Sequence, residues 1–281
     1  MKKIIFLSLL FLGFKAEAQK GIIFKVKYLP NHTYTGAINM EINCNATLSG
    51  NDTVISKLAS QGITQPVTAN IKFKMNGNTQ TSAAGPDGTF PLTMKYKFDD
   101  LSAAINGNPI PIPTEKLGAG VSIYGHVGKD GKLKADSIGG KKMADTSEEK
   151  VSKMMNAIQK NIKFPDHPMK IGETFTQDMP LAIPVGGSNM DLDSKVVYKL
   201  VSMADGNAIF DVQQSMNMTI PISGSSMMVN GTGTGKLVYS IKNNFATDYS
   251  SNLVIKISGK VKTLQVDATA KVDMDYKYDI Q

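Results

Sequence analysis

Residues 266–278 read Val-Asp-Ala-Thr-Ala-Lys-Val-Asp-Met-Asp-Tyr-Lys-Tyr, an alternation of apolar and polar side chains with a period of two. Successive side chains of a β-strand point to opposite faces, so this segment would place Val, Ala, Met and Tyr on one face and Asp, Thr and Lys on the other. Antiparallel sheets with one buried and one solvated face have this pattern. The stretch therefore predicts a long amphipathic strand.

The same alternation recurs along most of the chain, at 38–44, 67–75, 90–98, 121–127, 192–200, 210–220, 237–241 and 253–257. Residues that tolerate tight hairpin turns lie beside these stretches, namely Asn76-Gly77-Asn78, Asp87-Gly88, Asp130-Gly131 and Asp205-Gly206. We therefore expect a mainly β protein built of antiparallel curved sheets or half-barrels.

One segment has helical periodicity instead. Apolar residues between Val151 and Ile162 recur at intervals of three and four, Thr146 and Glu149 have the spacing of a capping box, and Pro165 would stop the helix. This pattern predicts one amphipathic helix near 147–163, covering a face of a sheet.

The predicted helix separates two halves that begin alike. Each half opens with a short apolar segment containing Lys, at 26–30 and 169–172, followed by a strand that starts with an aromatic residue between threonines. We expect a signal peptide at 1–18, a first β unit at 19–140, a linking helix at 141–166 and a second, similar β unit at 167–281. The alternative is a single large α+β half-barrel of the lipoprotein-carrier type.

The first residues have the pattern of an export signal. Lys2 and Lys3 precede an apolar run at 4–14, and Ala16-Glu17-Ala18 forms a small-x-small cleavage site, so cleavage is expected between Ala18 and Gln19. The only cysteine is Cys44, which is not next to that site and could not carry an N-terminal lipid. We expect a periplasmic or extracellular protein that is not lipid-anchored and has no transmembrane segment after processing.

Composition excludes some classes of function. The 281 residues carry a formal net charge of +7, and every residue counted as Lys or Arg is Lys; the sequence also has no Trp. Arginine is the residue that binds phosphate and guanine with two parallel hydrogen bonds, so its absence argues against nucleic-acid binding. A single cysteine excludes an intramolecular disulfide.

The sequence contains no recognisable metal or cofactor site. His32, His126 and His167 are not spaced as ligands, so we interpret them as surface residues. The aspartates of the last strand carry the oxygens that calcium binds, but Lys271 and Lys277 lie among them on the same face. A solvated charged face is therefore the simpler interpretation. Those aspartates are Asp267, Asp273, Asp275 and Asp279.

No catalytic set is recognisable either. Cys44 continues the apolar face of 38–44, where a thiol packs as a small hydrophobic group rather than acting as a nucleophile. Residues 231–236 alternate Gly with Thr and end in Lys, but Asn230 and Leu237 stand where a phosphate loop needs Gly and Ser or Thr, so we interpret the run as a Gly-rich strand. We expect no enzyme activity and no cofactor.

Methionine is the compositional oddity, with 16 residues that fall mostly on predicted inward faces. Methionine side chains are flexible and polarizable and adapt to varied apolar partners. The leading hypothesis is an exported non-enzymatic module that binds a lipid-like or hydrophobic ligand in a Met-rich concavity, with the predicted helix as a lid or plug. The alternatives are methionines that simply fill a core, an envelope structural or protein-interaction protein, and a hydrolytic enzyme whose residues are scattered in sequence.

The layout resembles a family of exported, β-rich bacterial proteins of unknown function. The resemblance rests on the Lys-Asp-Gly-Lys hairpin at 129–132 and on Pro-Met-Lys-Ile-Gly-Glu-Thr-Phe at 168–175, where Phe175 stands at the position of an aromatic residue in that family. It implies two similar β units joined by a helix and implies no activity.

Overall fold

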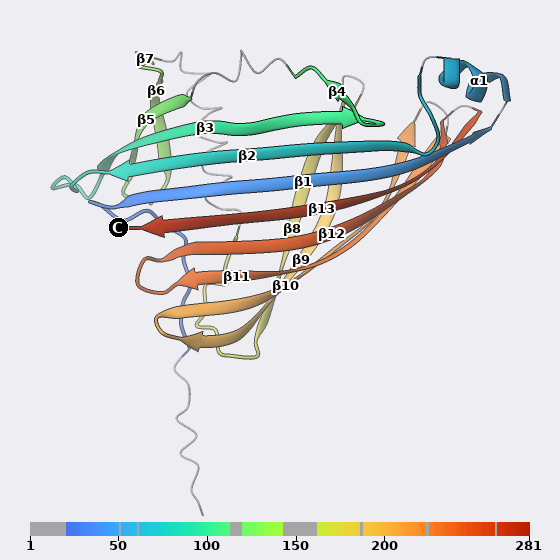
Figure 1. The fold of residues 1–281 in the computed structure, drawn as a ribbon. Coiled ribbons are helices and arrows are strands. Elements are labelled where there is room, and N and C mark those ends of the chain that lie inside the picture. The colour runs from blue at the N-terminus through green and yellow to red at the C-terminus, as the bar shows by residue number, and fades with distance from the viewer. Residues whose placement is uncertain are drawn as a thin grey trace, which may run out of the picture.

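A computed structural model describes residues 21–50, 52–60, 62–112, 120–142, 162–185, 188–222, 225–261 and 263–281. The described chain forms one open antiparallel sheet of 13 strands and one short helix. Figure 1 shows the sheet curling, so that β8 and β9 cross the view at a steep angle to β1 and β13. The mainly β, antiparallel prediction is confirmed.

The strands of the first half are β1 (Thr33–Gly50), β2 (Val67–Thr81), β3 (Phe90–Ile105), β4 (Asn108–Ile110), β5 (Val121–Val127), β6 (Leu133–Ile138) and β7 (Lys141–Lys142). Those of the second half are β8 (Thr174–Val185), β9 (Ser188–Ala204), β10 (Asn207–Ile222), β11 (Ser225–Ser240), β12 (Phe245–Val261) and β13 (Leu264–Ile280). Their order in the sheet is β7-β6-β5-β3-β2-β1-β13-β12-β11-β10-β9-β8, with β4 on β3.

Two up-and-down arrays therefore meet along one seam, where β1 pairs with β13 from Tyr34 opposite Ile280 to Gly50 opposite Leu264. The sheet runs without interruption across the predicted units 19–140 and 167–281, and the described residues do not show two separate units. The predicted signal peptide lies outside the described residues, as does the segment 143–161, which holds most of the predicted helix; Ile162 and Lys163 are not helical.

A helix that the sequence did not lead us to expect, α1 (Asp52–Ser60), connects β1 to β2. Asp52 in its first turn and Lys57 in its last turn have the charges that the helix dipole favours at each end. None of its residues is buried, so α1 contributes little to the core.

Three of the four predicted hairpin turns are confirmed. Asp87-Gly88, Asp130-Gly131 and Asp205-Gly206 lie in turns, and Asp205 and Gly206 both have positive φ, 52° and 74°, as a tight hairpin requires. The fourth, Asn76-Gly77-Asn78, is wrong as a turn because it lies within β2.

Gly77 has a packing role instead. It lies directly opposite Gly36 of β1, and each glycine is covered by a tyrosine ring. A β-carbon at Gly77 would approach the Tyr96 ring to 3.0 Å, and one at Gly36 would overlap the ring of Tyr278. Two adjacent strands thus lack side chains where aromatic rings from neighbouring strands lie on the backbone.

The main core lies on one face of β8–β12 and is covered by two segments without regular structure, around Phe24 and Phe164. The Phe24 ring lies 5.2 Å from that of Phe210 and 5.1 Å from that of Tyr239, both measured between ring centroids. Tyr239 also ties the segment down, because its hydroxyl donates to the Lys25 carbonyl oxygen at 2.6 Å. We call the face of the sheet that carries Phe210 and Tyr239 the inner face.

Candidate ligand-binding face

The inner face is largely apolar, but its burial differs from one strand to another. In the register row that contains Tyr249, Leu237 and Phe210, these side chains are at most 9% exposed. Beyond this row the inner side chains of β1, β12 and β13 are only half-buried. We call this second region the open apolar face; it comprises Ile42, Cys44, Ala46 and Leu48 of β1, Leu253, Ile255 and Ile257 of β12, and Val266, Ala268, Ala270 and Val272 of β13.

The strict alternation in sequence produces this surface. In β13 the inner residues from Val266 to Val272 are half-buried, whereas Asp267 and Lys271 on the other face are exposed. The open apolar face carries no charged side chain, since its eleven positions hold only Ile, Leu, Val, Ala and Cys. Methionines continue it onto β10 and β11, where Met216 and Val229 are buried and Met218 and Met227 pack against them.

Three glycines of β11 shape the inner face beside this surface. Gly231, Gly233 and Gly235 occupy successive inner positions of the run that superficially resembles a phosphate loop, and they lie in a continuous strand, as the sequence predicted. A β-carbon at Gly233 would come within 2.7 Å of the Asn252 carbonyl oxygen. Neighbouring strands thus approach closely, and Met216 lies over Gly231 in the space that a side chain would fill.

A glutamine amide interrupts the apolar inner face, where the serines Ser194 and Ser251 also lie. Gln214 of β10 lies in the register row of Gly233, Leu253 and Val272, at the boundary between the core and the open apolar face. Its Nε2 donates to the Tyr249 hydroxyl at 2.7 Å. Its Oε1 is buried and accepts no hydrogen bond from the described part of the chain. Buried acceptors without a donor are uncommon and costly, so this amide stands out.

A gap in the apolar alternation marks Gln214 in the sequence. Along 210–220 the inward positions hold Phe210, Val212, Met216, Met218 and Ile220, and position 214 is the single gap in that series. A polar residue at an inward position of an otherwise apolar strand is the signature of a buried polar group.

Cys44 lies on the open apolar face, as predicted from the alternation, but it is half-buried rather than fully enclosed. Burial raises the pKa of its thiol. The group is therefore protonated near neutral pH and is a poor nucleophile, which agrees with its packing role.

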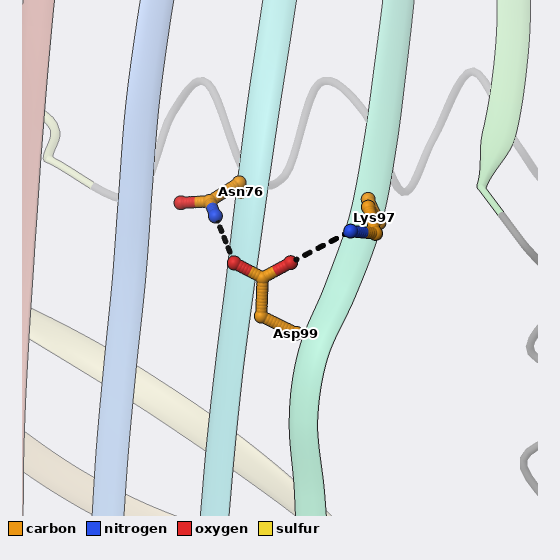
Figure 2. A network of polar contacts seen from close by, with 3 residues as sticks. All are labelled: Asn76, Lys97 and Asp99. Atoms are coloured by element: carbon orange, nitrogen blue, oxygen red, sulfur yellow. Dashed lines mark hydrogen bonds and ion pairs between the residues drawn. The ribbon is translucent and has the colours of Figure 1, made fainter.

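The opposite face of the sheet is polar and is cross-linked by amide–carboxylate hydrogen bonds. Asn39 donates to Asp275 at 2.8 Å across β1 and β13, and Asn252 donates to Asp273 across β12 and β13. Figure 2 shows the same device on β2 and β3, where Asp99 accepts from Asn76 and pairs with Lys97 Nζ at 3.4 Å. Asp99 is the extra residue of a β-bulge.

These bonds involve the four aspartates of the last strand, which the sequence pattern predicts to form a solvated charged face rather than a calcium site. Each of the four aspartates accepts from an amide or hydroxyl group, Asp267 from Ser258 and Gln265, Asp273 from Asn252, Asp275 from Asn39 and Asp279 from Gln281. Among the described residues, no three His, Cys, Asp or Glu side chains come close enough together to hold a metal ion.

The three histidines have separate local partners. His126 lies 3.2 Å from Asp136 on the neighbouring strand, whereas the Nδ1 atoms of His32 and His167 lie 2.7 Å and 3.2 Å from the carbonyl oxygens of Pro30 and Pro168. The structure does not bring them together.

The polar face also carries a shallow hollow of about 900 Å³ across β8–β12. It is bordered by Lys195 and Lys256 and floored by Asn217, Asn230 and Thr232, all of them exposed. Most of its lining residues project from the polar face, away from the open apolar face, although Ser194, Met216 and Gly231 also border it.

No protein-family model matches this chain, and no curated protein matches it. In the described part of the chain, no helix has the length and apolar character needed to cross a membrane.

Proposed function

We propose that this chain is an exported, non-enzymatic binding module that holds the hydrocarbon part of a lipid-like ligand on its open apolar face. The observation that supports it is the incomplete burial of a continuous apolar surface on the inner face of a sheet whose other face is polar and exposed. Exposed contiguous apolar surface is rare on soluble proteins and commonly marks a binding site.

The dimensions suit an acyl chain. From Leu253 to Gly259 the inner face of β12 extends over six steps along the strand, or about 20 Å at about 3.4 Å per step. The hydrocarbon core of a bilayer is about 30 Å thick, so the acyl chains of one leaflet span about 15 Å. A single extended acyl chain could therefore lie along the strand direction and remain in contact with apolar side chains throughout.

The finer division of the fold is also a proposal. We infer that β1–β6 and β8–β13 derive from one duplicated unit. Its support is that both halves open with a similar lead-in segment, at 26–30 and 169–172. Ile22, just before the first of these segments, also pairs with Met169 of the second, since the Ile22 N–H donates to the Met169 carbonyl oxygen at 3.0 Å and the Met169 N–H donates back at 2.9 Å.

Cys44 provides a direct test of ligand binding, because it is the single cysteine of the chain and lies on the surface in question. The rate of its alkylation by iodoacetamide would be measured with and without phospholipid or monoacylglycerol. We expect bound lipid to slow alkylation at least severalfold. Native mass spectrometry of the same samples should show one or a few lipids per chain.

The control places the cysteine on the other face. In a Cys44→Ala, Thr47→Cys variant the thiol projects from the exposed polar face of the same strand, and lipid should leave its alkylation rate unchanged. Equal rates for Cys44 with and without lipid, together with no lipid in the mass spectrum, would refute the proposal. Protection of Thr47→Cys alone would favour a partner on the polar face instead.

A further inference from the structure

We propose that Gln214 is the polar recognition group of the open apolar face, and that the preferred ligand is a neutral lipid whose head carries a hydroxyl donor. This inference rests on the proposed function, since it names the class of lipid that the face would hold. Its basis is the juxtaposition of a buried, unpaired amide oxygen with an uncharged apolar surface.

The nitrogen of the Gln214 amide has a partner within the chain, whereas its oxygen has none in the described part. Gln214 Nε2 donates to the Tyr249 hydroxyl at 2.7 Å, and Tyr249 in turn interacts with the side chain of Ser251. This chain of contacts uses the donor side of the amide and leaves Oε1 as the free acceptor. Ser251 and Tyr249 are at most 9% exposed, so the whole group lies within the apolar face.

The free oxygen is closed to solvent in the ligand-free chain, so a head group reaches it only after neighbouring side chains move aside. A β-carbon built on Gly233 would lie 3.0 Å from Gln214 Oε1, so this oxygen lies over a residue without a side chain. The next residue along the row is Leu253, which belongs to the open apolar face. A ligand whose head lies over Gly233 would thus place its chain along β12 towards Ile257.

The charge of the site selects the head group. An ionised carboxylate or phosphate only accepts hydrogen bonds, and it would face the Gln214 acceptor with no lysine on the open apolar face to balance its charge. A hydroxyl group donates to Oε1 and carries no charge. Monoacylglycerols and long-chain alcohols have this chemistry, and ionised fatty acids do not.

Three probes with the same fourteen-carbon chain separate the contributions. Monomyristin has hydroxyl donors, methyl myristate is neutral without a donor, and myristate is ionised at pH 8. We expect monomyristin to bind the protein about three- to tenfold more tightly than methyl myristate, the difference that one hydrogen bond makes, and myristate to bind least tightly. Affinities would be measured by titration calorimetry or by protection of Cys44 from alkylation.

Gln214→Leu removes the acceptor at similar volume. The variant should bind monomyristin and methyl myristate equally, with the loss confined to monomyristin, and its melting temperature should be unchanged or higher because an unpaired buried oxygen has been removed. The matched control is Gln213→Leu, one residue away on the exposed polar face, which should leave all three affinities unchanged.

The outcomes distinguish this inference from the proposed function. Equal binding of monomyristin and methyl myristate by the unaltered protein, or tightest binding of myristate, would overturn the role of Gln214 while leaving lipid binding in place. Binding of none of the three probes would overturn both. A preference for monomyristin that survives in Gln214→Leu would assign the donor contact to another residue and refute the inference.

Discussion

Two leucines on neighbouring strands test whether the open apolar face is a surface or part of a sealed core. Leu237 of β11 is 0% exposed and packs in the main core, whereas Leu253 of β12 is half-buried at the boundary of the open apolar face. Both point to the inner face. Truncation of each to alanine removes the same atoms from the two environments.

The structure predicts unequal costs. Leu237→Ala creates a cavity in a closed core and should lower the free energy of unfolding by about 3 to 5 kcal/mol. Full burial of a leucine side chain contributes about 1.5 to 3 kcal/mol to the free energy of unfolding. Because Leu253 is only half-buried, Leu253→Ala should lower that free energy by about 1 kcal/mol. The control Val254→Ala, 37% exposed on the polar face, should stay within about 0.5 kcal/mol of the unaltered protein.

Urea unfolding followed by circular dichroism measures these differences in ligand-free protein. The slope of unfolding free energy against urea should be unchanged, so that the midpoints report stability directly. If Leu253→Ala cost as much as Leu237→Ala, the open apolar face would be closed in solution, and the reasoning that assigns it to a ligand would fail.

Three further predictions concern the sheet itself. Gly36→Ala should destabilise the protein by about 1 to 3 kcal/mol in urea unfolding, because a β-carbon at this position displaces the Tyr278 ring that covers the strand. A variant of unaltered stability would contradict that packing. β8 is the last strand of the sheet in the described part of the chain. Its even-numbered residues direct their backbone N–H away from β9, since the Glu173 carbonyl accepts from Leu200, and Pro180 and Pro184 interrupt this outer edge. Replacing both prolines with Thr should therefore produce concentration-dependent association in light scattering, and unchanged mass at every concentration would show that they do not protect the edge. Burial raises the pKa of Tyr96 to about 12, so the stability associated with its neutral form is complete below pH 10 and is lost as the pH rises through 12. Tyr96→Phe should reduce this alkaline loss of stability by at most about 2.7 kcal/mol. The control is Tyr124→Phe, at a residue that is 41% exposed, which should not reduce it. Equal pH profiles of stability for the two variants would refute the assignment to Tyr96.

Sequence periodicity predicted most of the long strands and their faces, but it did not predict the short strands β4, β6 and β7. The alternation in 266–278 correctly placed Val272 and Met274 on the inner face and Asp273 on the polar face, because a strand's side-chain period depends only on local geometry. The order of strands could not be obtained in this way. The pairing of β1 with β13 joins distant parts of the chain, and no local pattern specifies which strand is the neighbour.

The remaining errors have the same origin. Asn76-Gly77-Asn78 has the composition of a turn, and only the Tyr96 ring from another strand explains why it is extended. Gln214 could have been recognised as an inward polar residue, but the absence of a partner for its oxygen is visible only in three dimensions. Local composition indicates what a residue favours, and contacts from distant strands decide what it does.

The seam between β1 and β13 has a consequence for how the sheet forms. Each array on either side can grow by adding hairpins, which bring together neighbouring parts of the chain and form quickly. The seam joins residues such as Asn39 and Asp275, 236 positions apart, so it has the largest entropic cost and should close last. Until then two long amphipathic strands present unpaired edges, and the time before closure is when the chain is most exposed to aggregation and most in need of a chaperone.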